Sequence, residues 1–174
     1  MTRRSRGREV ALQVLYQVEQ NAGISSDEIH RFIVRRLLED RKLCEFTESL
    51  TAGVKEHQAE LDVMISQVAE NWRLDRMAAI DRNILRLGAY EMLYCPEVPA
   101  KVAINEALEL AKRYSTAQSS RFVNGILDRV LQWQTEEPKS PAEPELVPGP
   151  VPSATIAEPA PSPPEAAPNE TQGE

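Results

Sequence analysis

Proline is distributed so unevenly along this chain that it limits the part able to fold. Eleven of the thirteen prolines lie at or after Pro138, and the segment from there to Glu174 has no aromatic residue. Such a segment buries too little apolar surface to offset the entropy lost on ordering it. We therefore predict one compact domain over residues 1–135 and a disordered, Pro/Glu-rich tail over residues 136–174.

Within the first 135 residues, apolar side chains recur at intervals of three and four, the spacing of amphipathic helices. We expect helices near residues 8–21, 26–37, 43–54, 61–72, 77–95, 99–111 and 122–130, with Trp72 ending the fourth apolar stripe. A polar loop is expected at 115–119, and no segment alternates strictly enough to form a strand. The predicted fold class is all-α, a compact bundle of about seven helices.

The charge is as uneven as the proline content. The net charge is −7, and the tail from Pro138, with one Lys and six Glu, contributes −5 of it, which leaves the folded part near −2. The first eight residues contain Arg3, Arg4, Arg6 and Arg8 and no acid. Because binding follows the local charge, the acidic total does not exclude a nucleic-acid partner.

Several classes of protein are disfavoured. Cys44 and Cys95 form no disulfide framework, and His30 and His57 are isolated from other metal ligands. The glycines are scattered singly, so no phosphate-binding loop is expected. No apolar run approaches the roughly 18 residues that span a membrane, and no secretory signal is predicted. We expect a cytoplasmic protein without catalytic residues, metal site, cofactor or enzymatic activity.

The N-terminal arginines are the first feature that suggests a ligand. Arginines placed just before a helix can bind phosphates in a bidentate geometry. A solvated, frayed terminus would explain the same four residues equally well.

A second group lies on the fifth predicted helix, where Arg82, Arg86 and Tyr90 follow one another at one-turn intervals. These side chains could form a ligand-binding ribbon. Taken by themselves, they are explained better as a solvated flank that is ion-paired with Asp81 or Glu91.

The last predicted helix carries a more specific pattern. Arg121, Asn124, Gly125 and Asp128 share one stripe and could contact base edges, while Phe122 borders the apolar side, where a ring can stack on an unpaired base. The alternative is that Phe122 is a core residue and that Gly125 permits close helix packing.

Four segments together resemble one known family. They are Arg8–Tyr16, Asp81–Glu91, Val98–Lys112 and Phe122–Asp128, in the same order along residues 3–131. They are similar to the NusB family of bacterial transcription antitermination factors.

The resemblance implies a helical fold of two packed subdomains. It also implies binding to the boxA element of nascent ribosomal RNA, jointly with NusE, a ribosomal protein of the small subunit. Through that complex, RNA polymerase and other Nus factors would be partners in reading through termination sites. Carried over by position, the RNA-contact candidates are Arg3, Arg4, Arg6, Arg8, Tyr16, Arg86, Arg121, Phe122, Asn124 and Asp128.

Two departures and two alternatives remain. The tail is not a usual part of the family, and Gln118 stands where some relatives carry an acid. A NusB-like domain attached to a ribosomal RNA methyltransferase would share the fold, although the tail is too short for a catalytic domain. A helical protein–protein adaptor would need no RNA. A homodimer of the free protein is a further possibility that the sequence leaves open.

Overall fold

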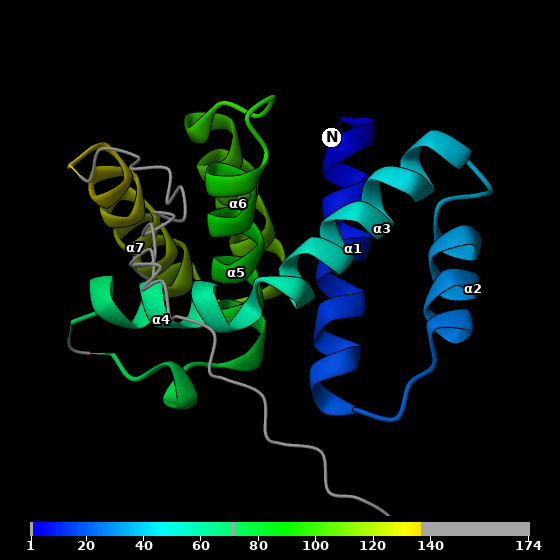
Figure 1. Ribbon diagram of the computed structural model, residues 1–174, viewed down its shortest axis with the longest axis horizontal. Coiled ribbons are helices and arrows are strands. Elements are labelled where there is room, and N and C mark those ends of the chain that lie inside the picture. The colour runs from blue at the N-terminus through cyan, green and yellow to red at the C-terminus, as the bar shows by residue number, and fades with distance from the viewer. Residues whose placement is uncertain (1, 71, 137–174) are drawn as a thin grey trace, which may run out of the picture. The chain divides into compact units, whose positions relative to one another are not determined.

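The computed structural model describes residues 2–70 and 72–136, which form a bundle of helices (Figure 1). In these residues there are seven α-helices, one short 3-10 helix and no strand. They are α1 (Arg3–Gln20), α2 (Ser26–Arg36), α3 (Arg41–Glu56), α4 (Gln58–Val68), η1 (Leu74–Arg76), α5 (Ala79–Tyr94), α6 (Ala100–Tyr114) and α7 (Ala117–Glu136). The all-α prediction of about seven helices is confirmed. The predicted tail lies, from residue 137 onward, outside the described residues, so the proposed division at residue 135 stays a prediction.

Helix α1 is shared between two hydrophobic cores. One of its faces, with Val10 and Val14, packs against residues of α2 and α3 in a small cluster. Another face, with Ala11, Leu12 and Leu15, packs into a larger cluster that includes residues of α3 to α7. This arrangement gives the two packed subdomains, α1–α3 and α4–α7, with residues of both α1 and α3 in each core.

Helix α2 is the most weakly buried of the seven. Within α2, Ile33 is the buried residue, and Leu37 follows it at the C-cap. The helix begins with a capping box, in which the Ser25 side chain accepts from the backbone of Glu28 while the Glu28 carboxylate accepts from Ser25. Local capping and one row of apolar contacts therefore hold α2 in place.

The helix boundaries differ from the prediction at three points. Helix α1 begins at Arg3, capped by Thr2, so the arginine run lies within the helix and not before it. Trp72 lies beyond the end of α4 and is 62% exposed, not part of the apolar stripe. Helix α7 begins at Ala117, inside the predicted loop. In each case a cap or a tertiary contact, which spacing does not encode, sets the boundary.

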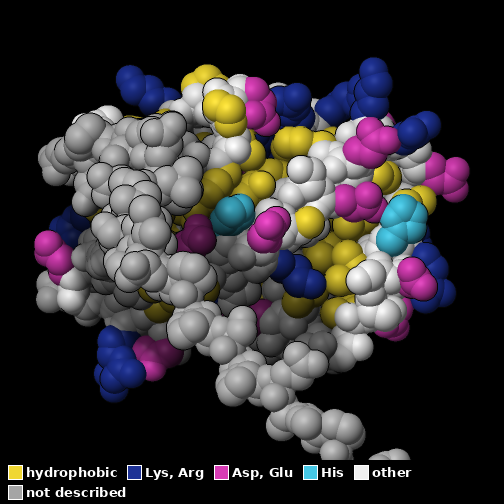
Figure 2. Space-filling view, viewed as in Figure 1, with side chains coloured by type: hydrophobic (Ala, Val, Ile, Leu, Met, Phe, Trp, Pro, Cys, Tyr) yellow, Lys and Arg dark blue, Asp and Glu magenta, His cyan; other side chains and the backbone are white. Residues whose placement is uncertain are grey.

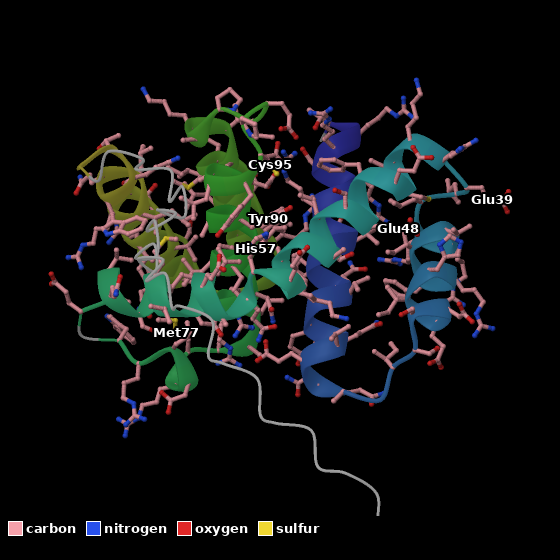
Figure 3. The ribbon with its side chains drawn as sticks, in the orientation of Figure 1. Glu39, Glu48, His57, Met77, Tyr90 and Cys95 are labelled. Carbon is pink, nitrogen blue, oxygen red and sulfur yellow. The ribbon has the colours of Figure 1, made fainter. Side chains whose placement is uncertain are left out.

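A group of three rings joins α3, α4 and α5. Tyr90 stacks on Tyr94 with ring centroids 5.4 Å apart, and Tyr94 stacks on His57 at 4.0 Å. Figure 3 labels His57 and Tyr90 where α3, α4 and α5 meet. Tyr90 also lies against Gly53, where an added Cβ would come within 2.0 Å of the tyrosine hydroxyl oxygen and 2.2 Å of Cζ. Helix α3 therefore approaches α5 closely because residue 53 has no side chain.

Two glycine substitutions separate this close approach from helix propensity. Both Gly53→Ala and Gly125→Ala place a better helix former in a helix interior, but an added Cβ at Gly125 meets no atom within 4 Å. We expect Gly53→Ala to lower the free energy of unfolding by about 1–3 kcal/mol, since the Tyr90 ring must leave its stack. Gly125→Ala should raise it by roughly 0.5–1 kcal/mol. Urea unfolding followed by circular dichroism measures both, and equal effects would contradict the steric explanation.

Candidate RNA-binding site

The first three arginines of α1 are at the surface or close to it. Arg3 forms an ion pair with Asp40, and the Arg4 guanidinium lies 5.3 Å from the centroid of the Phe46 ring. The Arg6 Nη1 atom donates to the Glu9 carboxylate at 2.6 Å. Arg3 and Arg4 are exposed, whereas Arg6 is half-buried. Arg3 and Arg4 are thus the members of the run that an external phosphate can reach most easily.

Arg8 differs from the other three because it is 3% exposed. Its Nε donates to both Glu91 carboxylate oxygens at 2.9 Å, and its Nη2 donates to Glu91 Oε1 at 2.7 Å. Its Nη1 lies 3.7 Å from Glu106 Oε2. Burial opposes the charge of Arg8, but the hydrogen bonds and charge of Glu91 outweigh burial and raise the arginine pKa. In this conformation Arg8 joins α1 to α5, and its Nε and Nη2 donors are occupied by Glu91.

Arg86 is occupied in a similar way, at 6% exposure. Its Nε and Nη2 atoms donate to Asp62 of α4 at 2.6 and 2.8 Å, and its Nη1 donates to Glu19 of α1 at 2.9 Å. Arg82 also pairs with Glu19. Burial by itself raises the pKa of Glu19, but the hydrogen bonds from Arg82 and Asn83 together lower it by more, so the pKa lies below its usual value. These pairs connect α1, α4 and α5, with partners other than the Asp81 and Glu91 suggested by spacing.

On α7, the predicted stripe is partly paired within itself. The Asn124 amide donates to the Asp128 carboxylate at 2.7 Å, while Arg121 is exposed. Gly125 is also exposed and has open space around it, so close helix packing does not explain this glycine. The stripe is a polar, accessible face next to Phe122.

Phe122 is half-buried, and its exposed part faces Trp72. The two ring centroids are 5.1 Å apart with an interplanar angle of 61°. This edge-to-face arrangement is typical of aromatic pairs. The exposed Trp72 ring therefore extends the apolar surface of Phe122 toward solvent.

The two rings line a pocket of about 330 Å³ formed by η1 and the starts of α5 and α7; its polar lining includes Arg76, Asp81, Gln118 and Ser119. Asp81 is 8% exposed, and its Oδ2 accepts from the Ser119 hydroxyl at 2.9 Å. In the described part of the chain, Asp81 Oδ1 is buried and has no donor. An unpaired buried acceptor costs about 1–3 kcal/mol, which a ligand N–H would recover once a movement of the Asp81 side chain exposed Oδ1.

The structure brings only some of the predicted residues together. Phe122 lines this pocket; on α7, Arg121 precedes Phe122, and Asn124 and Asp128 follow it. Arg86 lines a neighbouring pocket of about 820 Å³ that also includes Trp72. Tyr16 is exposed on α1 but lines neither pocket, and the N-terminal arginines lie at the opposite end of α1 from Glu19.

Two residues of the pocket were missed from the sequence, Trp72 and the carboxylate of Asp81. Trp72 fitted the helical spacing of Leu61 and Ile65, and Asp81 was considered only as an ion-pair partner. Asn71, a residue type favoured just past the end of a helix, was the available sequence signal.

Comparison with known proteins identifies the family. The family model named NusB family matches residues 5–132. The chain belongs to the NusB family. The transcription antitermination protein NusB of Anaeromyxobacter dehalogenans (strain 2CP-1 / ATCC BAA-258) is 46% identical over 129 residues, which are 74% of this chain and 90% of that protein.

Solved NusB structures have the same fold. T. maritima NusB is 37% identical, with a TM-score of 0.67 and coverage of 76% of this chain and 92% of that one. A crystal structure of antitermination factors NusB and NusE in complex with dsRNA matches with a TM-score of 0.69 and 22% identity, covering 76% of this chain and 98% of that one. At 22% identity the likeness concerns the fold.

Two further observations concern the described residues only. None of their helices is long and apolar enough to cross a membrane. Among the same residues there is no group of three or more His, Cys, Asp and Glu side chains placed to hold a metal ion.

The buried pair of Arg8 and Glu91 allows a stability test. Arg8→Met should lower the free energy of unfolding by about 3–5 kcal/mol, because it leaves the Glu91 carboxylate buried without its partner. Adding Glu91→Leu should recover most of that loss, since apolar side chains can replace a buried pair. Lys101→Met, at an exposed position, serves as the control. Unfolding in urea gives the free energy of unfolding of the native chain, the single variant, the double variant and the control. A loss below about 1 kcal/mol for Arg8→Met would refute the structural role of the pair.

Proposed function

We propose that this chain is a transcription antitermination factor that binds the boxA element of nascent ribosomal RNA together with NusE. In this role it helps RNA polymerase, with other Nus factors, to read through termination sites in the cytoplasm. Its action is recognition without chemistry, so no catalytic residue, metal or cofactor takes part. The observation that carries the proposal is the pocket between Trp72 and Phe122 with the unpaired Oδ1 of Asp81.

The pocket suits an unpaired RNA base. A base has a flat face that can stack on an aromatic ring and edge N–H groups that can donate to a carboxylate. Phe122 and Trp72 supply the rings, and Asp81 supplies the acceptor. Because the carboxylate accepts and does not donate, it favours a base edge that presents an N–H group toward it.

The remaining predicted residues take different roles in this proposal. Arg3, Arg4 and Arg121 contact phosphates, which positions the strand without reading its sequence. Arg6 and Tyr16 lie on the same helix as Arg3 and are secondary contacts. Asn124 and Asp128 read a second base after their mutual hydrogen bond opens. Arg8 and Arg86 are positioning residues, because their guanidinium groups hold α1 against α5 and α4.

Support for NusE as partner comes from the relative crystallised as NusB and NusE in complex with dsRNA. We expect NusE to raise the affinity for boxA RNA by about 5- to 150-fold, the range of a coupling free energy of 1–3 kcal/mol. Fluorescence anisotropy of a labelled boxA RNA, with and without NusE and against a scrambled RNA, measures this effect. An adaptor without RNA-binding activity would bind neither RNA. Sedimentation of the free protein tests the possible homodimer.

The pocket itself is tested with two variants that preserve its shape. Phe122→Leu keeps apolar bulk but removes the ring, and we expect a loss of boxA affinity of about 5- to 150-fold, from 1–3 kcal/mol of stacking. Asp81→Asn replaces one carboxylate oxygen by a donor and should weaken binding by about 10-fold, within the usual cost of a mispaired buried group. Glu97→Gln, an exposed acid between α5 and α6, makes the same charge change elsewhere. If the Asp81→Asn and Glu97→Gln variants bind boxA RNA with the same affinity, the pocket does not hold the base.

A further inference from the structure

A second cationic feature lies where the start of α1, the end of α2 and the start of α3 meet. Four arginines, Arg3, Arg6, Arg35 and Arg36, border a groove of about 770 Å³ with an apolar floor. We call it the arginine groove. Figure 1 places these three helix ends at one corner of the bundle, and Figure 2 shows Lys and Arg side chains near that corner, interspersed with acidic ones.

Among the described residues, two of the four arginines are paired with carboxylates, and the other two are not. Arg3 pairs with Asp40 and Arg6 pairs with Glu9. Arg36 donates to the neutral Gln13 amide oxygen at 3.0 Å and lies over the Phe32 ring. Arg35 has no carboxylate partner within residues 2–70 and 72–136. The α2 side of the groove is therefore an uncompensated positive surface.

The turn between α2 and α3 keeps one acid out of the groove. Leu38 and Glu39 both adopt left-handed backbone conformations, with φ of 52° and 61°. After this turn Glu39 does not line the arginine groove but a neighbouring pocket, together with His30, Arg31 and Arg35, and Figure 3 shows it at the outer edge of the bundle. Asp40, already paired with Arg3, is the carboxylate that remains among the groove's lining residues.

We propose that the arginine groove binds the phosphate backbone of RNA that flanks the segment held at the Trp72–Phe122 pocket, with Arg35 and Arg36 as the main contacts. The inference rests on the proposed RNA-binding function and adds a second contact region with no sequence preference. Guanidinium groups match phosphate oxygens in bidentate geometry, and phosphate contacts position a strand without reading its bases.

The distance between the two regions sets the length of RNA required. Arg3 lines the groove, while Glu19, sixteen residues further along α1, lines a pocket together with Trp72. At 1.5 Å per residue the helix separates them by about 24 Å. At the 3.4 Å phosphate spacing of one strand of a duplex, roughly seven nucleotides cover that distance, and an extended single strand needs fewer. A short boxA RNA that fills the pocket and reaches no further than Arg3 leaves Arg35 and Arg36 without a phosphate, whereas a strand extended by ten nucleotides reaches them.

The test compares two RNAs and two matched double variants. Labelled RNAs containing only boxA, or boxA extended by ten unstructured nucleotides on each side, are titrated with the full chain at several salt concentrations. Arg35→Gln with Arg36→Gln removes two charges from the groove. Lys101→Gln with Lys112→Gln removes two from exposed positions on α6. Because Arg36 contacts Gln13 and Phe32, Arg35→Glu alone provides a variant without a described side-chain contact to lose.

We expect the native chain to bind the extended RNA more tightly than the short one. The groove variant should lose about 3- to 10-fold in affinity for the extended RNA, and its salt slope should become shallower by about 1.4, from roughly 0.7 per lost phosphate contact. Arg35→Glu should reduce the affinity for the extended RNA at least as much as the loss of one positive charge would. Affinity for the short RNA should change less than about twofold, and the α6 variant should match the native chain on both RNAs.

Three results would overturn the inference. They are equal affinity of native and groove-variant chains for the extended RNA, an equal loss on the short RNA, and a loss seen only in the presence of NusE. The last would assign the groove to a protein surface. Failure of the proposed function is distinguishable, because the native chain would then show no preference for boxA over a scrambled RNA of the same length.

Discussion

The ion pair between Arg8 and Glu91 is the contact on which the rest of the arrangement depends. It joins α1 to α5 inside the protein, and a buried charge of this kind is stable only with its partner in place. Near the other end of α1, Glu19 accepts from Arg82 and Arg86 of α5. Polar clamps at both ends therefore fix the angle and register of α1 against α5, while the apolar residues between them supply most of the free energy of packing.

These clamps also place the pocket. Arg82 donates to the backbone oxygens of Leu74 and Met77, at 2.9 and 3.1 Å, which holds η1 close to α5. Trp72 precedes η1 and Asp81 follows it, so the same contacts set the position of both lining residues. Arg82, whose charge suggests a ligand contact, thus positions the pocket, while Trp72 and Asp81 line it.

Periodicity predicted the number and type of helices because apolar spacing is a local property that tertiary packing reinforces. It could not predict which arginines are buried, because Arg8 and Arg3 look alike in the sequence. Arg8 is buried because Glu91, 83 residues away, faces it, and sequence spacing does not show that contact. Trp72 was assigned to a stripe because its spacing fits a helix that in fact ends at Val68. The family resemblance indicated Phe122 as an RNA-contact candidate, and the structure places this ring in a pocket; Asp81 required the structure, because an unpaired oxygen is visible only when all neighbours are placed. Whether these residues contact RNA stays a prediction.

Sharing α1 between two cores has a consequence for how the bundle opens. Amide protons of α1 are protected from exchange with solvent until both cores separate, so they should exchange only through global unfolding. We expect helix α2, with Ile33 as its buried residue, to detach while α1 stays docked. Its amides should therefore exchange through a smaller, sub-global opening. The α2 part of the arginine groove thus belongs to the least cooperative helix, which leaves Arg35 and Arg36 free to adjust to a strand whose path varies from one transcript to the next.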